Sequence, residues 1–410
     1  MIFIGNSKRR GTPTMTQVSD GIKKVLEATE AILPEIAAAG KDGDRDRRVR
    51  DDIIEKLKET GALGISKPER FGGLGANARE MLEVSTLVGR ADAGAGWVVM
   101  LTNVCGWLTA HMNHEVQAEV WGGDNPNPVL TGVLMPTSTA EKVEGGYRVS
   151  GKWHYNSGSW WSDWAGIGFP VPDENGEIVS VGLGVIPRSD YEIEDTWYIS
   201  GMRGSASNSI VANDVFVPDH RVMLVPPAIE GEYPSVSAKD EPVYRTAFIP
   251  LLVIVLVGPS LGAAEAALEY VREKAQQKPV SQTFFEKQAD STALQLKVAQ
   301  AAQKIEVARL LTFDVCDRLD AWGREGVYPE PLERTRVKAN TGYIMELLQE
   351  AIETLMWVHG SGSYADSNPM QRWWRDIHVG TSHAVGSPSI GYETYGKLLL
   401  GNETSITPMI

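Results

Sequence analysis

Polar and aromatic side chains gather in three short segments of this sequence. The first segment, Gly145–Gly158, alternates like a β-strand and ends with Tyr155 and Ser157. Because these two residues are two positions apart, we expect them on one face of the strand. An aromatic ring beside a hydroxyl and free backbone N–H groups would suit a flat heteroaromatic ligand. An ordinary strand end with aromatic residues in the core remains the alternative.

The second segment, Gly201–Ser207, is rich in glycine and serine and is followed by the strand-like run Asp214–Pro218. Serine hydroxyls and backbone amides beside Arg203 could hold an anion. A plain turn between two strands would explain the same residues.

The third segment begins with the Gly/Ser loop His359–Tyr364 and continues into a helix that carries Asp376 and His378. His383 lies seven residues after Asp376, so we expect the two on one helix face, two turns apart and too distant for a direct hydrogen bond. A histidine with a pKa near neutral can take up and release protons. A surface histidine with ordinary ion pairs is the alternative.

Several common catalytic motifs are absent from the sequence. It contains no GxxxxGK[ST] phosphate loop, no HExxH zinc motif and no GxSxG nucleophile turn. The run Gly94–Gly96 continues into a helical pattern rather than a strand-turn-helix unit, so it does not predict a dinucleotide site. His378 and His383 are five residues apart and do not form an i, i+4 metal pair. We therefore expect neither bound metal nor a Rossmann-type NAD(P)H site.

The composition narrows the class of protein further. The chain has 410 residues, with 39 Lys plus Arg against 53 Asp plus Glu, and a net charge of −14. This balance argues against binding to nucleic acid or to an anionic membrane surface. The two cysteines, Cys105 and Cys316, form no CxxC pair and suit a reducing cytoplasm. Tryptophan is unusually frequent, with 12 residues against 8 phenylalanines.

The elements that must position the three segments follow from the hydrophobic periods. Helical i, i+3, i+4 spacing runs from Val18 to about Trp121, short alternating runs follow to Pro227, and long helical patterns return up to Gly401. We therefore predict an N-terminal α-helical domain over 15–125, a central β domain over 126–235 and a C-terminal four-helix bundle over 236–410. The apolar run Ala247–Leu268 is broken by proline and glycine, which favours a buried core helix over a membrane span.

Together the three segments, in this order, resemble the acyl-CoA dehydrogenase superfamily. Lys67–Gly75 is similar to its PE-x-(F/Y)-GG-x-G motif, and Gly151–Gly158 to its flavin-facing strand. Gly201–Ser205 with Asp214–Pro218 is similar to its GMRGS…DVxVP stretch, and Gly360–Asp376 to its GGxGY…P…R..RD element. The resemblance implies an α+β fold of N-terminal helices, a central β-barrel or sandwich, and a C-terminal helical bundle.

One departure separates the chain from the dehydrogenases. The position eight residues after Asp376, where those enzymes commonly carry a catalytic Glu, is Ala384, and His383 precedes it. The chain is thus more similar to the two-component flavin-dependent monooxygenases of the same fold, such as those that hydroxylate phenolic steroid fragments or p-hydroxyphenylacetate. Near Trp107 these relatives often carry a second active-site His, where this chain has Cys105.

This resemblance implies an oxygenase component that takes reduced FMN or FAD from a separate NAD(P)H-dependent reductase. With O₂ the flavin would form a C4a-hydroperoxide, which would hydroxylate a small aromatic molecule, phenolic or polycyclic. The resemblance also implies a cytoplasmic homotetramer. An acyl-CoA dehydrogenase with a relocated base, N- or S-oxygenation by the same flavin chemistry, and a non-enzymatic scaffold remain alternatives.

The implied site residues fall into three groups. The catalytic group comprises His383, Ser157, His378 and Asp376. The cofactor-binding group comprises Trp153, Tyr155, Ser157, Gly158, Arg203 and Ser205. The substrate-binding group comprises Cys105, Trp107, Trp160 and Trp374, and Trp161, Trp164 and Trp373 could also line an aromatic pocket.

Overall fold

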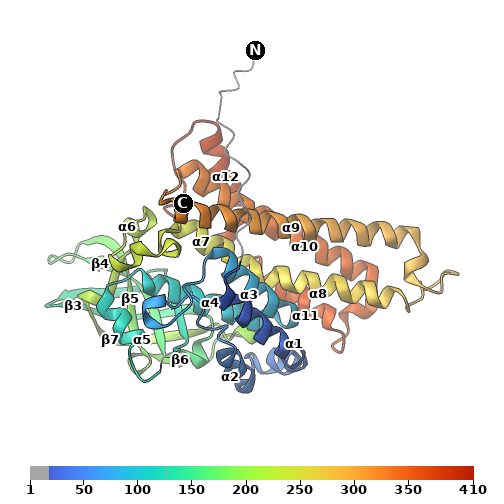
Figure 1. Ribbon diagram of the computed structural model, residues 1–410, viewed down its shortest axis with the longest axis horizontal. Coiled ribbons are helices and arrows are strands. Elements are labelled where there is room, and N and C mark those ends of the chain that lie inside the picture. Colours follow the sequence, from blue (N-terminus) through green and yellow to red (C-terminus); the bar gives the residue numbers. More distant parts are fainter. Residues whose placement is uncertain (1–17, 126) are drawn as a thin grey trace, which may run out of the picture.

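Among the described residues, helices form the first and last parts of the fold and strands occupy the middle, as the hydrophobic periods predict (Figure 1). The structure, a computed structural model, describes residues 18–125 and 127–410. The predicted domain starts at 15 and 126 therefore lie outside the described residues. The N-terminal helices are α1 (Asp20–Asp46), α2 (Asp51–Glu59), the 3-10 turn η1 (Glu69–Phe71), α3 (Ala78–Ala91), α4 (Ala93–Ala110) and α5 (His114–Trp121).

The middle of the chain forms two separate four-stranded sheets. Their strands are β1 (Leu130–Val133), β2 (Ser138–Val143), β3 (Gly146–Asn156), β4 (Trp164–Pro172), β5 (Ile178–Pro187), β6 (Glu192–Glu194), β7 (Asn208–Pro218) and β8 (Val222–Leu224). One sheet has the order β1-β4-β5-β8 and the other β2-β3-β7-β6. Of the two expected forms, the domain is therefore a sandwich and not a closed barrel. Its interior is a small core of its own that includes Val149, Phe169 and Ile210.

A short helix, α6 (Val225–Ile229), follows the strands. The C-terminal part then contains the short helix α7 (Phe248–Ile254) and the longer helices α8 (Gly258–Ala275), α9 (Thr292–Glu325), α10 (Pro331–His359), α11 (Pro369–Gly380) and α12 (Pro388–Leu399). Helices α8, α9 and α10 run side by side away from the sheets (Figure 1). The short turns η4 (Arg203–Ser205) and η11 (Ala384–Gly386) matter for the site described below.

The N- and C-terminal helices share one hydrophobic core, which runs from Ile22 to Ile377. Helix α3 lies directly against α8, and glycines make that contact possible. A Cβ atom on Gly262 would lie only 2.1 Å from the carbonyl oxygen of Thr86. The two helical segments therefore form one packed body, although the strands separate them in the sequence.

Two helical segments, Ala93–Ala110 and Phe248–Ala275, are long and apolar enough to cross a membrane by length and composition alone. In an apolar stretch of 18 residues within each segment, 89% and 78% are buried inside the fold. The second contains most of the apolar run Ala247–Leu268, and its burial confirms the core-helix interpretation.

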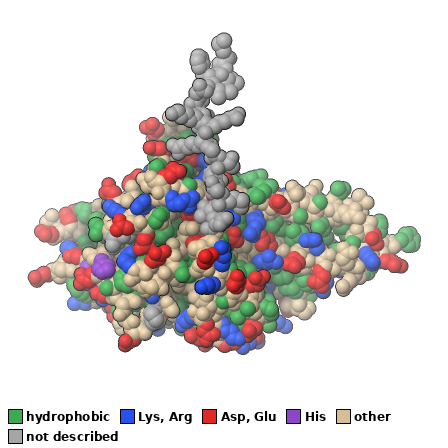
Figure 2. Space-filling model, in the orientation of Figure 1, with side chains coloured by type: hydrophobic (Ala, Val, Ile, Leu, Met, Phe, Trp, Pro, Cys, Tyr) green, Lys and Arg blue, Asp and Glu red, His purple; other side chains and the backbone are tan. Residues whose placement is uncertain are grey.

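On the face seen in Figure 2, acidic and basic side chains are interspersed over the surface.

A close backbone contact brings α4 against the β domain. Asp92 caps the N-terminus of α4 by accepting a hydrogen bond from the N–H of Ala95 at 2.9 Å. One turn of small residues follows, and a Cβ atom on Gly94 would lie 2.9 Å from the Cα of Gly204. The absence of a side chain there lets the start of α4, and Trp97 with it, approach turn η4.

Candidate active site

The end of strand β3 is irregular, and it leaves the Tyr155 side chain exposed and the Ser157 side chain buried. The pairing of β3 with β7 shifts register between Trp153 and Asn156, and Tyr155 adopts a left-handed backbone conformation with φ of 69°. Tyr155 is 68% exposed, whereas Ser157 is 5% exposed. The prediction that both lie on one face is wrong, because the bulge breaks the strand's two-residue period. Strain of this kind in a non-glycine residue is typical of functional sites.

Ser157 lies in a buried polar cluster. Its Oγ accepts a hydrogen bond from the Nε1–H of Trp97 at 3.0 Å and lies 2.8 Å from the Oγ of Ser207. The Oγ of Ser207 in turn lies 2.7 Å from that of Ser205. Gly158, with φ of 74°, donates its N–H to the carbonyl oxygen of Ser205 at 2.8 Å. The structure thus brings together Ser157, Gly158 and Ser205, three of the predicted cofactor-binding residues.

His383 approaches this cluster from the C-terminal segment. It follows the end of α11, and its ring centroid lies 6.0 Å from that of Trp97. Its Nδ1 accepts a hydrogen bond from the backbone N–H of Val385 at 3.3 Å, and burial lowers its pKa. The imidazole is therefore neutral near pH 7 and carries its proton on Nε2. Trp97 accordingly contacts both His383 and Ser157.

The seven-residue spacing predicts that Asp376 and His383 share a helix face. This prediction is wrong, because α11 ends at Gly380, before His383. Instead Asp376 is buried and accepts a hydrogen bond from the N–H of Met202 at 2.6 Å. Burial, with Asp92 nearby, raises its pKa to about 7. This carboxyl joins α11 to the turn that leads to Ser205.

His378 and Trp374 lie away from the Ser157 cluster. Both bind Oε1 of Glu353 on α10, His378 through Nε2 at 2.9 Å and Trp374 through Nε1 at 2.7 Å. Two residues along a helix turn the side chain by about 200°, which directs His378 to the opposite side from Asp376. The predicted roles of His378 in catalysis and of Trp374 in substrate binding therefore find no support in this arrangement.

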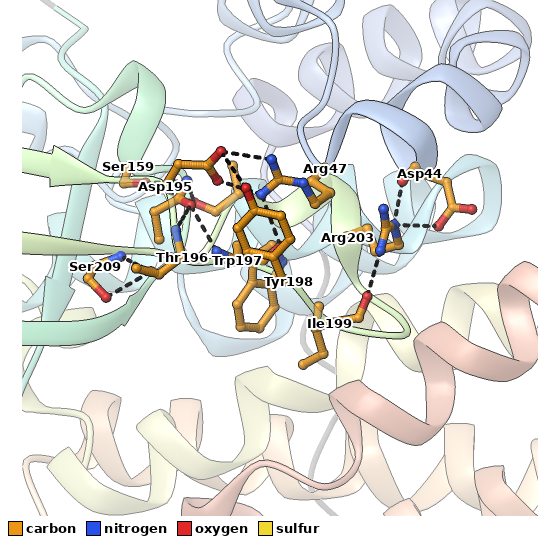
Figure 3. Close-up of polar contacts among 12 residues, drawn as sticks. Asp44, Arg47, Ser159, Asp195, Thr196, Trp197, Tyr198, Ile199, Arg203 and Ser209 are labelled. Atoms are coloured by element: carbon orange, nitrogen blue, oxygen red, sulfur yellow. Dashed lines mark hydrogen bonds and ion pairs between the residues drawn. The ribbon is translucent and has the colours of Figure 1, made fainter.

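Two further predicted cofactor-binding residues, Trp153 and Arg203, make contacts within the protein. Trp153 is fully buried in the core of the β sandwich and donates its indole N–H to the carbonyl oxygen of Gly168 at 2.7 Å. Arg203 points towards the end of α1, where it contacts Asp44, and it donates to the carbonyl oxygen of Ile199 at 2.8 Å (Figure 3). Two nitrogens of its guanidinium group, Nε and Nη1, therefore already have partners within the protein.

The loop before Arg203 is fastened to the end of α1 by further contacts (Figure 3). Arg47 pairs with Asp195 at 2.5 Å and lies 3.8 Å from the ring centre of Tyr198. Asp44 also pairs with Arg375 of α11 at 2.8 Å. These ion pairs join the N-terminal helices, the β domain and α11 around the Ser157 cluster.

The predicted substrate-binding residues lie in three different settings. Trp107 is fully buried against His111, at a ring distance of 4.1 Å, and donates its indole N–H to the carbonyl oxygen of Val243. Cys105 is buried, which raises the pKa of its thiol to about 12, so it stays protonated. Trp160 is 37% exposed and lies 5.9 Å from the guanidinium of Arg48.

The other tryptophans named for an aromatic pocket are also dispersed. The indole of Trp161 donates to Asp51, that of Trp164 lies beside Arg221, and that of Trp373 lies against Tyr270. The contacts of the described residues therefore do not assemble the predicted tryptophan-lined pocket.

Four residues of the site were missed as candidates. Trp97 and Ser207 hold Ser157, while Asn156 and Thr102 are buried with their Oδ1 and Oγ1 atoms unpartnered by any described residue. Trp97 follows a Gly94–Gly96 run, and such small residues at the start of an apolar helix are a signal of close packing. The unpartnered oxygens have no signal in the sequence, because only the fold shows that they are buried.

One group of described residues, Glu115, Glu119 and His220, lies close enough to hold a metal ion. Glu119 is already shared by His220 at 2.9 Å and by Arg221 at 2.6 Å. We interpret the group as a surface ion-pair cluster, because the arginine supplies the positive charge that a cation would bring.

Comparison with known proteins identifies the family. Residues 23–122 match the N-terminal domain of acyl-CoA dehydrogenase, and residues 254–388 match its C-terminal domain. The chain is 31% identical over 384 residues to the flavin-dependent monooxygenase oxygenase subunit HsaA of Mycobacterium tuberculosis, covering 92% of this chain and 95% of that protein. The chain belongs to the flavin-dependent monooxygenases of the acyl-CoA dehydrogenase family. This result confirms the fold and family predicted from the sequence.

Two further relatives support this family assignment. The present monooxygenase is 28% identical to the oxygenase component of p-hydroxyphenylacetate 3-hydroxylase from Acinetobacter baumannii, over 97% of this chain and 92% of that protein. The structure of XiaF from Streptomyces sp. in complex with FADH2 and glycerol superposes with a TM-score of 0.89 at 29% identity, covering 95% of this chain and 98% of that one. The monooxygenase is thus a flavin-dependent oxidoreductase.

The residues around Ser157 fit a flavin. The polar edge of an isoalloxazine ring offers one N–H donor and several acceptor atoms side by side. The unpartnered Asn156 Oδ1 can accept from that donor, and the hydroxyls of Ser157 and Thr102 can donate to the acceptors. Gly158 lies beside Thr102, since a Cβ atom there would be 4.0 Å from Thr102 Oγ1. These polar atoms of the monooxygenase therefore match the ligand that its family binds.

Proposed function

We propose that this chain is the oxygenase component of a two-component monooxygenase that hydroxylates a small aromatic molecule, phenolic or polycyclic. Reduced FMN or FAD would come from a separate NAD(P)H-dependent reductase, and O₂ would be the co-substrate. The observation that carries the proposal is that a buried neutral imidazole, His383, and a buried hydroxyl, Ser157, both lie against Trp97. The names of the relatives, HsaA and p-hydroxyphenylacetate 3-hydroxylase, support an aromatic substrate.

When bound, the reduced flavin supplies the activation of O₂ and the transfer of one oxygen atom to the substrate. The protein must then keep water from the reacting atoms, and Trp97, which is 6% exposed, provides an apolar wall beside Ser157. Ser157, Thr102 and Asn156 would hold the polar edge of the flavin.

His383 would orient the substrate by donating a hydrogen bond from Nε2 to its oxygen atom. Its Nδ1 is occupied by the N–H of Val385, so the lone pair that a general base needs is already used. Cys105 cannot act as a base near neutral pH, because burial raises its pKa to about 12. The site therefore orients its substrate through one imidazole.

Product analysis tests this function. The protein is mixed with FMN, an unrelated flavin reductase, NADH, ¹⁸O₂ and a panel of phenols, aryl amines and aryl thioethers. We expect one labelled oxygen atom on the carbon ring of a phenol. Label on nitrogen or sulfur would show that the reaction is N- or S-oxygenation and not ring hydroxylation. Loss of flavin colour with acyl-CoA would indicate dehydrogenation instead.

Two variants separate the roles of His383. Glutamine at this position keeps an N–H donor near the Nε2 position, whereas alanine removes it. If His383 orients the substrate, His383→Gln keeps about a tenth or more of kcat and His383→Ala loses about a hundredfold. Equal loss in both variants, with a pH profile that loses its acidic limb, would assign His383 as the base.

We also propose that the protein is a cytoplasmic homotetramer. Apolar side chains on the outer faces of the C-terminal helices support the assembly. Leu310 on α9 is 64% exposed, Trp357 on α10 is 62% exposed and Tyr392 on α12 is 40% exposed. Burial of such groups between copies is a common source of assembly energy. Light scattering of the purified protein should give four chains, and a monomer would contradict this part of the proposal.

A further inference from the structure

The loop that carries His383 is short, and its backbone decides where the imidazole points. Helix α11 ends at Gly380 and η11 begins at Ala384, with the loop between them. The ring of His383 has little freedom of its own, because its Nδ1 accepts the N–H of Val385 within the same segment. The direction of Nε2 therefore follows from how this loop is held by the helices around it.

Close packing fixes the points where the loop leaves α11 and meets α10. A Cβ atom on Gly380 would lie 2.6 Å from Cε of Met202 and 3.5 Å from Cζ3 of Trp97. A Cβ atom on Gly386, beyond His383, would lie 2.5 Å from Cε of Met345 on α10. The loop thus starts beside Trp97 and ends against α10.

A hydrogen bond from α10 holds the start of the loop. Nε2 of Gln349 lies 2.7 Å from Oγ1 of Thr381, which in turn lies 2.6 Å from the carbonyl oxygen of Ile377. A carbonyl oxygen can only accept, so the Thr381 hydroxyl donates its proton to Ile377. Its lone pair then accepts the N–H of Gln349, which also fixes which way the Gln349 amide faces.

This bond is of a different kind from those around it. A threonine at a helix end commonly donates to the carbonyl four residues earlier, as Thr381 does, and that bond stays within one helix. The bond from Gln349 joins residues 32 positions apart. Among the described residues, no other hydrogen bond joins 381–383 to α10. Thr381 is 3% exposed, so water does not compete for its hydroxyl.

We propose that Gln349 and Thr381 are positioning residues that direct the His383 imidazole towards the substrate. The proposal rests on the proposed function in taking His383 as the group that orients the substrate. The His383 ring lies 6.0 Å from that of Trp97, so a tilt of the loop would move Nε2 relative to this wall. A displacement of about 1 Å can cost about a hundredfold in rate.

The fate of the oxygen tests the proposal. Each reduced FMN that reacts with O₂ gives oxidised FMN, together with either one hydroxylated phenol and one water or one hydrogen peroxide. The coupling is the amount of hydroxylated phenol formed per FMN oxidised. It is measured in a single turnover, with the protein in excess over FMN and with the phenol that becomes labelled in the ¹⁸O₂ experiment.

The variants remove one partner of the bond at a time. Gln349→Met keeps the length of the side chain without its N–H, and Thr381→Val keeps the shape without the hydroxyl. Each should lower the coupling about fivefold, the size of one neutral hydrogen bond. Thr381→Ser keeps the hydroxyl and should restore the coupling. The dissociation constant of FMN should not change, because among the described residues neither side chain hydrogen-bonds to the Ser157 cluster.

A second measurement needs neither flavin nor substrate. Diethyl pyrocarbonate acylates neutral imidazoles, and peptide mass spectrometry reports each histidine separately. His378, whose side chain is 33% exposed on α11, is the internal reference. The acylation of His383 relative to His378 should rise about fivefold in Gln349→Met and Thr381→Val, because the loop is released, and should keep its wild-type value in Thr381→Ser.

Thr394→Val is the matched control. Thr394 on α12 is 4% exposed, and its hydroxyl likewise lies 2.8 Å from the carbonyl oxygen four residues earlier, that of Ile390. Its hydroxyl contacts only carbonyl oxygens of its own helix, so its loss should leave the coupling and the acylation ratio unchanged. An equal fall in coupling in Thr394→Val and Thr381→Val would overturn the proposal, because the effect would then be one of packing.

Two other outcomes also decide the question. Wild-type coupling in both Gln349→Met and Thr381→Val overturns the positioning role while the proposed function stands. If the wild type hydroxylates no phenol, the proposed function itself fails, and the acylation ratio alone decides whether this pair holds His383. An unchanged ratio in both variants would then overturn the positioning role as well.

Discussion

Replacing Asp376 by asparagine should flatten the dependence of stability on pH. Burial raises the pKa of this carboxyl from 3.8 to about 7. Between these two values the folded protein binds a proton that the unfolded chain releases, so the free energy of unfolding falls as pH rises through this window. The whole effect is about 4 kcal/mol, of which about 2.5 kcal/mol lies between pH 5 and pH 8.

The assay is urea unfolding at pH 5 and at pH 8, followed by tryptophan fluorescence. The asparagine side chain keeps an Oδ1 acceptor for the N–H of Met202. Asp376→Asn should therefore lose about 2.5 kcal/mol less than the wild type over this pH change. Asp219→Asn, which removes a surface carboxyl paired with Lys142, is the matched control and should follow the wild type.

Equal pH dependence in Asp376→Asn and in the wild type would refute this reasoning. The same variants decide whether Asp376 has the catalytic role that the sequence suggested. A carboxyl that holds α11 to the Met202 turn should leave kcat within about threefold when asparagine preserves the hydrogen bond. A collapse of kcat with an unchanged unfolding profile would restore the catalytic assignment.

Three further predictions concern buried groups. His111 contacts the carbonyl oxygens of Trp107 and Tyr244, and burial lowers its pKa to about 4. Below pH 6.5 the unfolded chain therefore binds a proton at His111 that the folded protein does not bind, and stability falls. When the pH falls from 8 to 5, His111→Gln should lose about 2 kcal/mol less stability than the wild type, measured by urea unfolding. Gly262→Ala should destabilise the protein by about 1–3 kcal/mol or more, because the new Cβ atom would lie 2.1 Å from the carbonyl oxygen of Thr86. Gly396→Ala is the control and should be neutral or stabilising, because no atom lies within 4 Å of its Cβ position. Thermal melts measure both. Asp317→Asn removes the carboxylate at 2.9 Å from Arg79 but leaves Glu83 at 3.4 Å, so it should cost about 1–3 kcal/mol in urea unfolding. A cost below that of a surface pair such as Asp219 with Lys142 would contradict the prediction.

The sequence predicted the fold well because the fold depends on periodic patterns. Helical spacing in the first and last thirds and alternation in the middle follow directly from which side chains are buried. The choice between barrel and sandwich could not be made, since it depends on which strand edges pair, and that is set by contacts distant in the sequence. The sharing of one core by α3 and α8 was hidden for the same reason.

The site was predicted in part, and the failures have local physical causes. Ser157, Gly158 and Ser205 meet because each belongs to a turn whose backbone is held by the other segment. Tyr155 was misplaced because a left-handed residue in a strand leaves no mark in the alternation. The predicted roles of Trp153 and Trp374 follow from segments that resemble the family, but here their indole N–H groups bind Gly168 and Glu353. Aromatic side chains fill cores and pair with surface carboxylates as readily as they line pockets.

The central claim is that the chain binds reduced flavin and protects its reaction with O₂. The most direct measurement mixes protein-bound reduced FMN rapidly with O₂ and follows the absorbance spectrum. We predict a species whose spectrum belongs to neither reduced nor oxidised FMN, and which decays faster in Trp97→Phe and Ser157→Ala than in the wild type. Oxidation of FMN in a single step, at the rate of free flavin, would contradict the account.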